Sequence, residues 1–122
     1  MNRLNFPKEI GAEVRDFTIP RKDAGRYIKF DGELVAFATS DPHETRDRWT
    51  ELRIFRSSSG AYIGTSIGCT CLPGESDLID SDYSATVDGL IPFFTVDGKR
   101  SNLSLSLFEQ VISDLDLGVE HV

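Results

Sequence analysis

The chain has 122 residues, of which 39% are hydrophobic and 27% are charged, and its formal net charge at pH 7 is −7. This composition is long and apolar enough to bury a core, which excludes a disordered chain and predicts one domain over residues 1–122. The negative charge disfavours direct binding to DNA, RNA or an anionic membrane, because those partners are themselves negatively charged.

The N-terminal third of the chain has the pattern of β-strands. Residues 13–19 alternate apolar and polar side chains and stop at Pro20, which is typical of an edge strand. Two further β-prone runs flank Asp31-Gly32, a dipeptide that tolerates the positive φ of a tight turn. We therefore predict a β-hairpin over residues 26–39.

A second hairpin is predicted over residues 50–69, with its turn in the serine-rich and glycine-containing stretch 57–60. The returning strand places Gly64, Ser66 and Gly68 on one face, so that this face is nearly bare backbone. Glycines inside a strand often mark a close approach by another backbone. We expect a helix to cross there, and a ligand groove or a bulged edge are the alternatives.

The last third of the chain changes to helical spacing. Apolar residues between Tyr83 and Phe94 recur at intervals of three and four, which favours a helix over a strand, although Pro92 would shorten or break it. A second apolar stripe from Leu107 to Leu115 predicts a firmer C-terminal helix, with Ser104 or Ser106 as its N-cap.

The order of these elements, strands first and helices last, predicts an α+β fold. We expect an antiparallel sheet of about four or five strands, containing the hairpins 26–39 and 50–69. One or two C-terminal helices are expected to pack on one face of that sheet, because each buried apolar side chain of their stripes contributes about 1.5 to 3 kcal/mol.

Motifs for catalysis and metal binding are weak. Cys69 and Cys71 are separated by one residue, so a disulfide between them would be strained, and reduced thiols suit a cytoplasmic location. A zinc site needs four ligands, and the chain offers only His43 and His121 besides these thiols. His43 has neighbouring carboxylates but no nucleophile motif. We therefore predict no catalytic residue, no metal and no other cofactor.

Charge is distributed unevenly along the chain. Residues 1–60 carry eleven basic and ten acidic side chains, whereas residues 61–122 carry two and ten. The acidic stretch lacks the glycine and the twelfth-position glutamate of a calcium loop. A cluster of unpaired carboxylates attracts basic protein grooves. We expect a partner-binding surface formed by Glu75, Asp77, Asp80, Asp82 and Asp88.

These observations favour a small, acidic, non-catalytic binding protein of the cytoplasm that docks on a basic protein surface. In size, acidity and lack of motifs the chain is similar in type to accessory proteins of phages and other mobile elements, some of which inhibit nucleic-acid-handling host proteins. A structural subunit that self-associates, such as a homodimer, is one alternative. The other is a small ligand-binding or enzymatic domain that uses the face of Gly64, Ser66 and Gly68 with His43, Cys69 or Cys71.

Overall fold

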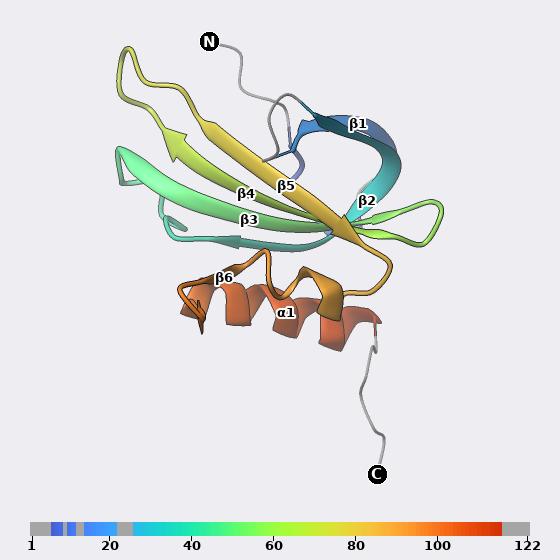
Figure 1. The fold of residues 1–122 in the computed structure, drawn as a ribbon. Coiled ribbons are helices and arrows are strands. Elements are labelled where there is room, and N and C mark those ends of the chain that lie inside the picture. The colour runs from blue at the N-terminus through green and yellow to red at the C-terminus, as the bar shows by residue number, and fades with distance from the viewer. Residues whose placement is uncertain (1–5, 9, 12–13, 22–25, 116–122) are drawn as a thin grey trace.

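The main element of the fold is one antiparallel sheet of five strands, in the order β1-β2-β3-β4-β5 (Figure 1). The computed structural model describes residues 6–8, 10–11, 14–21 and 26–115. Each strand pairs with the next one along the chain, so β1 and β5 form the two edges. The strands are β1 (Arg15–Pro20), β2 (Tyr27–Thr39), β3 (Arg48–Ser57), β4 (Tyr62–Thr70) and β5 (Leu78–Ser84).

The sheet curls into a half-barrel. At one end its two edges meet, because the Ser81 hydroxyl donates a hydrogen bond to the carbonyl of Pro20, and Arg21 forms an ion pair with Asp82 at 3.2 Å. A bulge in β2 near Val35 increases the bend of the sheet. The concave side is filled by the buried side chains Phe17, Ile19, Leu34, Phe55 and Ile63.

The convex side is covered by the C-terminal part of the chain. After β5 come η1 (Asp88–Leu90), a small hairpin of β6 (Thr95–Val96) and β7 (Lys99–Arg100), and α1 (Asn102–Leu115). Figure 1 shows α1 lying across the sheet, where it packs mainly on β2. This second core contains Val35, Ala36, Ala38, Leu52, Ile54, Leu90, Phe94, Leu107, Phe108 and Val111.

The α+β fold, the antiparallel sheet and the hairpin over 50–69 are confirmed, and the strand predicted over 13–19 corresponds to β1. The C-terminal helix is also confirmed, but the prediction of its cap was wrong. The Ser101 hydroxyl accepts a hydrogen bond from the backbone N–H of Ser104 at 3.1 Å, which makes Ser101 the N-cap. Within the described part of the chain, no helix is long and apolar enough to cross a membrane.

The hairpin predicted over 26–39 was wrong, because β2 runs through Asp31 and Gly32 as one continuous strand. Its first half pairs with β1 and its second half with β3, and Gly32 pairs with residues on both sides. A Cβ on Gly32 would lie 2.5 Å from the carbonyl oxygen of Arg56. The glycine therefore permits a close approach between β2 and β3 and does not form a turn.

The helix predicted between Tyr83 and Phe94 was also wrong. Tyr83 belongs to β5, in which Ile79 packs against the concave core and Ser81 is buried two residues later. The helical spacing beyond β5 gives only the short 3₁₀ helix η1. A Cβ on Gly89 would lie 1.8 Å from the Ser84 hydroxyl, so the turn after β5 requires this glycine.

Candidate functional site

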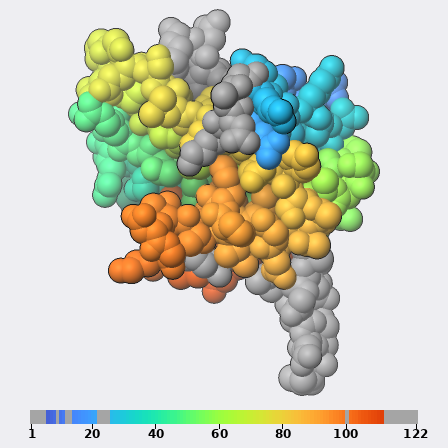
Figure 2. Space-filling view, viewed as in Figure 1, coloured from blue at the N-terminus to red at the C-terminus, as the bar shows by residue number. Residues whose placement is uncertain are grey.

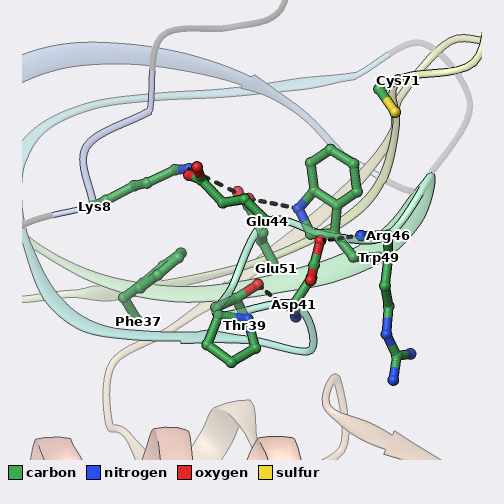
Figure 3. A pocket seen from close by; sticks show the side chains of 10 residues that line it. Lys8, Phe37, Thr39, Asp41, Glu44, Arg46, Trp49, Glu51 and Cys71 are labelled. Carbon is green, nitrogen blue, oxygen red and sulfur yellow. Dashed lines mark hydrogen bonds and ion pairs between the residues drawn. The ribbon is translucent and has the colours of Figure 1, made fainter.

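A pocket of about 360 Å³ lies on the concave side at one end of the half-barrel, where β2 and β4 end and β3 begins (Figure 3). We call it the mouth pocket. Its walls combine two aromatic rings with side chains of both charges. It is lined by Lys8, Phe37, Thr39, Asp41, Pro42, Glu44, Arg46, Trp49, Glu51 and Cys71.

The floor of the mouth pocket is the carboxylate of Glu51, whose side chain is only 6% exposed. The Trp49 indole N–H donates to its Oε2 at 2.8 Å, and Nη1 of Arg53 lies 2.9 Å from its Oε1. Burial disfavours the charged form, but the Trp49 hydrogen bond and the Arg53 charge outweigh it and lower the pKa of Glu51. The floor of the pocket is therefore anionic at neutral pH.

Arg53 continues this polar network into the interior, where it is 1% exposed. Its guanidinium carbon lies 4.7 Å from the centre of the Phe37 ring and 5.3 Å from that of Phe6. Its Nε donates to the carbonyl of Pro7 at 2.9 Å. Because aromatic faces attract cations, two rings and one carboxylate together hold this buried charge.

Lys8 spans the entrance of the mouth pocket (Figure 3). Its ammonium nitrogen lies 3.9 Å from Oε1 of Glu44 and 3.9 Å from Oε2 of Glu51. The Lys8 side chain is 54% exposed and that of Glu44 is 84% exposed, so both belong to the rim. The entrance therefore brings two carboxylates toward one cation.

The loop that forms the other wall of the pocket is held by Asp41. Its carboxylate accepts the backbone N–H groups of Thr45 at 3.0 Å and Arg46 at 2.9 Å. Burial opposes ionisation of Asp41, but these hydrogen bonds outweigh it and lower the pKa of the carboxyl group. Glu44 has a left-handed backbone conformation with φ of +55°, which a residue other than glycine adopts at a cost.

This site was not predicted from the sequence, because Glu51 and Arg53 were given no role beyond the hairpin predicted over residues 50–69. Phe55 was the available signal, because a large aromatic side chain that shares a strand face with Glu51 and Arg53 indicates that the face is buried. The sheet is in fact covered on both sides, so charged residues of β3 lie inside.

Two of the five predicted partner-binding carboxylates form ion pairs with arginines. Glu75 accepts two hydrogen bonds from Arg48, one of them to its Oε1 at 3.0 Å, and a third from the Thr70 hydroxyl at 2.7 Å. The Arg48 and Thr70 hydrogen bonds lower the pKa of Glu75 to about 2. Asp82 pairs with Arg21 at 3.2 Å. These two carboxylates are thus neutralised within the molecule.

The other three predicted carboxylates are Asp77, Asp80 and Asp88, which lie before β5, on β5 and at the start of η1. Asp77 accepts the backbone N–H of Thr70 at 2.9 Å. Asp80 lies on β5 two residues before Asp82, and therefore on the same side of the strand, while Asp88 begins η1. Figure 2 shows the stretch from β5 to β7, coloured yellow to orange, spread over one side of the molecule.

Of the residues proposed for a ligand site on the glycine face of β4, Gly68 and Cys69 line one surface hollow together, whereas Cys71 lines the mouth pocket. A Cβ on Gly64 would lie 2.9 Å from the Phe94 ring and 3.2 Å from that of Phe93, so aromatic side chains cover this glycine and no α-helix does. The two cysteines and His43 differ in their exposure. Cys69 is buried, whereas Cys71 is exposed on the rim of the mouth pocket, and His43 is also exposed.

His121 lies outside the described residues.

Among the residues that the structure describes, no three His, Cys, Asp or Glu side chains are grouped so that they could hold a metal ion. Comparison of the chain with models of known protein families, with curated proteins and with solved structures found no match.

Proposed function

We propose that the protein is a non-catalytic binding protein whose ligand site is the mouth pocket. The observation that carries this proposal is the buried ion pair of Glu51 and Arg53 at the pocket floor. A buried ion pair is rarely more stabilising than apolar side chains of the same size, because both charges lose their hydration. Ligand recognition gives a reason for retaining these charges where the half-barrel opens to solvent.

The dimensions and the lining of the pocket support this proposal. Its volume of about 360 Å³ matches small-molecule sites, which combine apolar walls with a few convergent polar groups. Phe37 and Trp49 supply the aromatic walls, and Glu51 supplies the polar floor. Because Asp41 fixes the adjacent loop, little of the binding free energy would be lost in ordering that wall.

The charges of the pocket favour binding over acid-base catalysis. A general acid or base works best when its pKa lies near the working pH. The pKa values of Glu51 and Asp41 are both lowered, so both carboxylates stay ionised at neutral pH. They are suited to attracting and orienting a ligand, and poorly suited to exchanging protons with it.

Trp49 provides a direct test, because it is the only tryptophan of the chain and it lines the pocket. We expect at least one class in a panel of small cationic, anionic and neutral compounds to change Trp49 emission and to raise the melting temperature. Phe37→Ala should weaken that response, whereas Val96→Ala, an exposed change on β6 away from Trp49, should leave it intact. A panel without any response at millimolar concentration would contradict the proposal.

Docking on a basic protein surface is a second candidate, favoured by the net charge and by two carboxylates in particular. Asp80 and Asp88 have no ion-pair partner in the described structure, and both lie on the stretch shown in yellow and orange in Figure 2. Such a surface would let the protein inhibit a basic host protein that handles nucleic acid. The double variant Asp80→Asn/Asp88→Asn should capture less of a basic partner at low salt, and equal capture would contradict this candidate.

A further inference from the structure

We infer that the mouth pocket binds a primary ammonium group on an alkyl chain, and that Lys8 holds the place of this group in the free protein. The inference rests on the proposed function of the pocket and adds the chemical class of its ligand. It follows from the position of Lys8 between two carboxylates that come from different parts of the chain. Glu44 belongs to the loop after β2, and Glu51 belongs to β3.

The charge balance of the pocket favours a cation at the position of the Lys8 ammonium. Asp41, Glu44 and Glu51 carry three negative charges, and Lys8, Arg46 and the buried Arg53 carry three positive charges. A ligand ammonium that displaces Lys8 keeps this balance, whereas a ligand carboxylate or phosphate at that position would face Glu44 and Glu51 directly.

Lys8 itself fits this position imperfectly. Its nitrogen is 3.9 Å from each carboxylate, which is longer than the 2.7 to 3.2 Å of N–H···O hydrogen bonds. The chain is anchored one residue earlier, where the Pro7 carbonyl accepts a hydrogen bond from Arg53. An untethered ammonium is free of this anchor, and the exposed Glu44 side chain can move toward it, so that it can donate hydrogen bonds to both carboxylates.

The interior of the protein already holds one cation in the same manner. The Arg53 guanidinium is paired with Glu51 and lies over the rings of Phe37 and Phe6. The entrance offers a cation the same kinds of group. The second oxygen of Glu51 and the carboxylate of Glu44 supply negative charge, and Trp49 and Phe37 supply aromatic rings in the walls. The rings would pack against the alkyl chain of the ligand while the carboxylates bind its N–H groups.

Such an ammonium group has two sources, a free alkylamine or the lysine side chain of a partner protein. Titration with n-butylammonium and with a lysine blocked at both ends, followed through Trp49 emission, separates them. Binding of n-butylammonium alone would assign a free amine, and binding of both would admit a lysine of a partner. Three compounds are the matched controls. n-Butanol has no charge, butyrate has a negative charge, and n-butyltrimethylammonium has the positive charge but no N–H donors.

Two exposed substitutions test the role of the rim without disturbing the core. Lys8→Gln removes the competing ammonium and should tighten n-butylammonium binding about threefold. Glu44→Gln removes one carboxylate and should weaken it about threefold. Lys29→Gln, which replaces an exposed lysine outside the mouth pocket, should change nothing.

The outcomes separate this inference from the proposed function. Tighter binding of n-butylammonium than of all three controls, with the opposite effects of Lys8→Gln and Glu44→Gln, supports the inference. If any of the three controls binds at least as tightly as n-butylammonium, if Lys8→Gln fails to tighten binding, or if Glu44→Gln fails to weaken it, the ammonium inference is overturned while the pocket remains a binding site. If none of the probes binds to the wild type or to Lys8→Gln, the inference is overturned, and the broader panel decides the proposed function.

Discussion

Glu51 and Arg53 lie two residues apart on β3 and form an ion pair inside the half-barrel, with Nη1 2.9 Å from Oε1. Alternation along a strand places both side chains on the concave face, and both are almost completely buried. Each charge lacks the hydration that it would have in water, so each depends on the other. The same ion pair therefore contributes to the stability of the fold and keeps the Glu51 carboxylate charged at the floor of the mouth pocket.

Replacing one member of this ion pair should lower the free energy of unfolding more than replacing both. Glu51→Gln leaves the Arg53 charge uncompensated, and we expect it to lower the free energy of unfolding by about 3 to 5 kcal/mol. Arg53→Met should have a similar effect by exposing Glu51 to an apolar interior. The double variant Glu51→Leu/Arg53→Met should lose less than either single variant. Urea unfolding of the four proteins measures this cycle, and equal or additive losses would contradict it.

Opposite Arg53 lies a buried hydroxyl group whose removal should stabilise the protein. Thr65 on β4 is fully buried, and its hydroxyl has no hydrogen-bond partner in the described structure. Thr65→Val keeps the shape and removes the unsatisfied group, so we expect the free energy of unfolding to rise by about 1 kcal/mol. The control is Thr39→Val, because the Thr39 hydroxyl accepts the N–H of Asp41 at 3.1 Å and its loss should be destabilising. Two changes of the same sign in thermal unfolding would refute this reasoning.

The strand face of Gly64 and Gly68 allows a matched pair of substitutions. At Gly64 a new Cβ would lie 2.9 Å from the Phe94 ring, so Gly64→Ala should lower the free energy of unfolding by about 1 to 3 kcal/mol. At Gly68 the nearest atom would be 3.8 Å away, and Gly68→Ala should raise it by about 0.5 kcal/mol. Chemical denaturation of both variants measures the difference. Similar free energies of unfolding would show that the Phe94 ring moves aside without loss of stability.

The same two glycines show what the sequence predicts well. Gly64 and Gly68 indicated a close approach on one face of β4, and the structure confirms it at Gly64. The identity of the covering group was not predictable, because Phe93 and Phe94 belong to a segment whose helical spacing suggested an α-helix. The spacing of apolar residues carries no information about the steric requirement at Gly89, because that requirement depends on the position of Ser84 in the folded chain.

The hairpin error has a related cause. Asp31-Gly32 has the composition of a tight turn, and nothing local distinguishes it from a glycine in the middle of a long strand. The requirement at Gly32 comes from Arg56, which is distant in sequence. The mouth pocket depends in the same way on contacts between Lys8, Glu44 and Glu51, and such contacts follow from the curl of the sheet and not from any motif.

The ion pair of Arg48 and Glu75 predicts a pH dependence at the acidic end of the range. The Arg48 and Thr70 hydrogen bonds lower the pKa of Glu75 from its ordinary value of 4.5 to about 2 in the folded protein. A carboxyl group with a lower pKa in the folded state contributes stability above its unfolded pKa and loses it as the pH falls through the folded pKa. The contribution of Glu75 should therefore be complete above about pH 4.5 and disappear toward pH 2.

Arg48→Met isolates this effect, because it removes the main cause of the low pKa. We expect the side-chain NMR signal of Glu75 to titrate near 2 in the wild type and closer to 4.5 in the variant. The stability difference between the two proteins should shrink as the pH is lowered through this window, since protonated Glu75 no longer pairs with the arginine. Arg56→Met, at the other end of β3, should leave the titration unchanged. A wild-type midpoint near 4.5 would mean that the ion pair does not persist in solution, because a lasting pair with Arg48 must favour the ionised carboxylate.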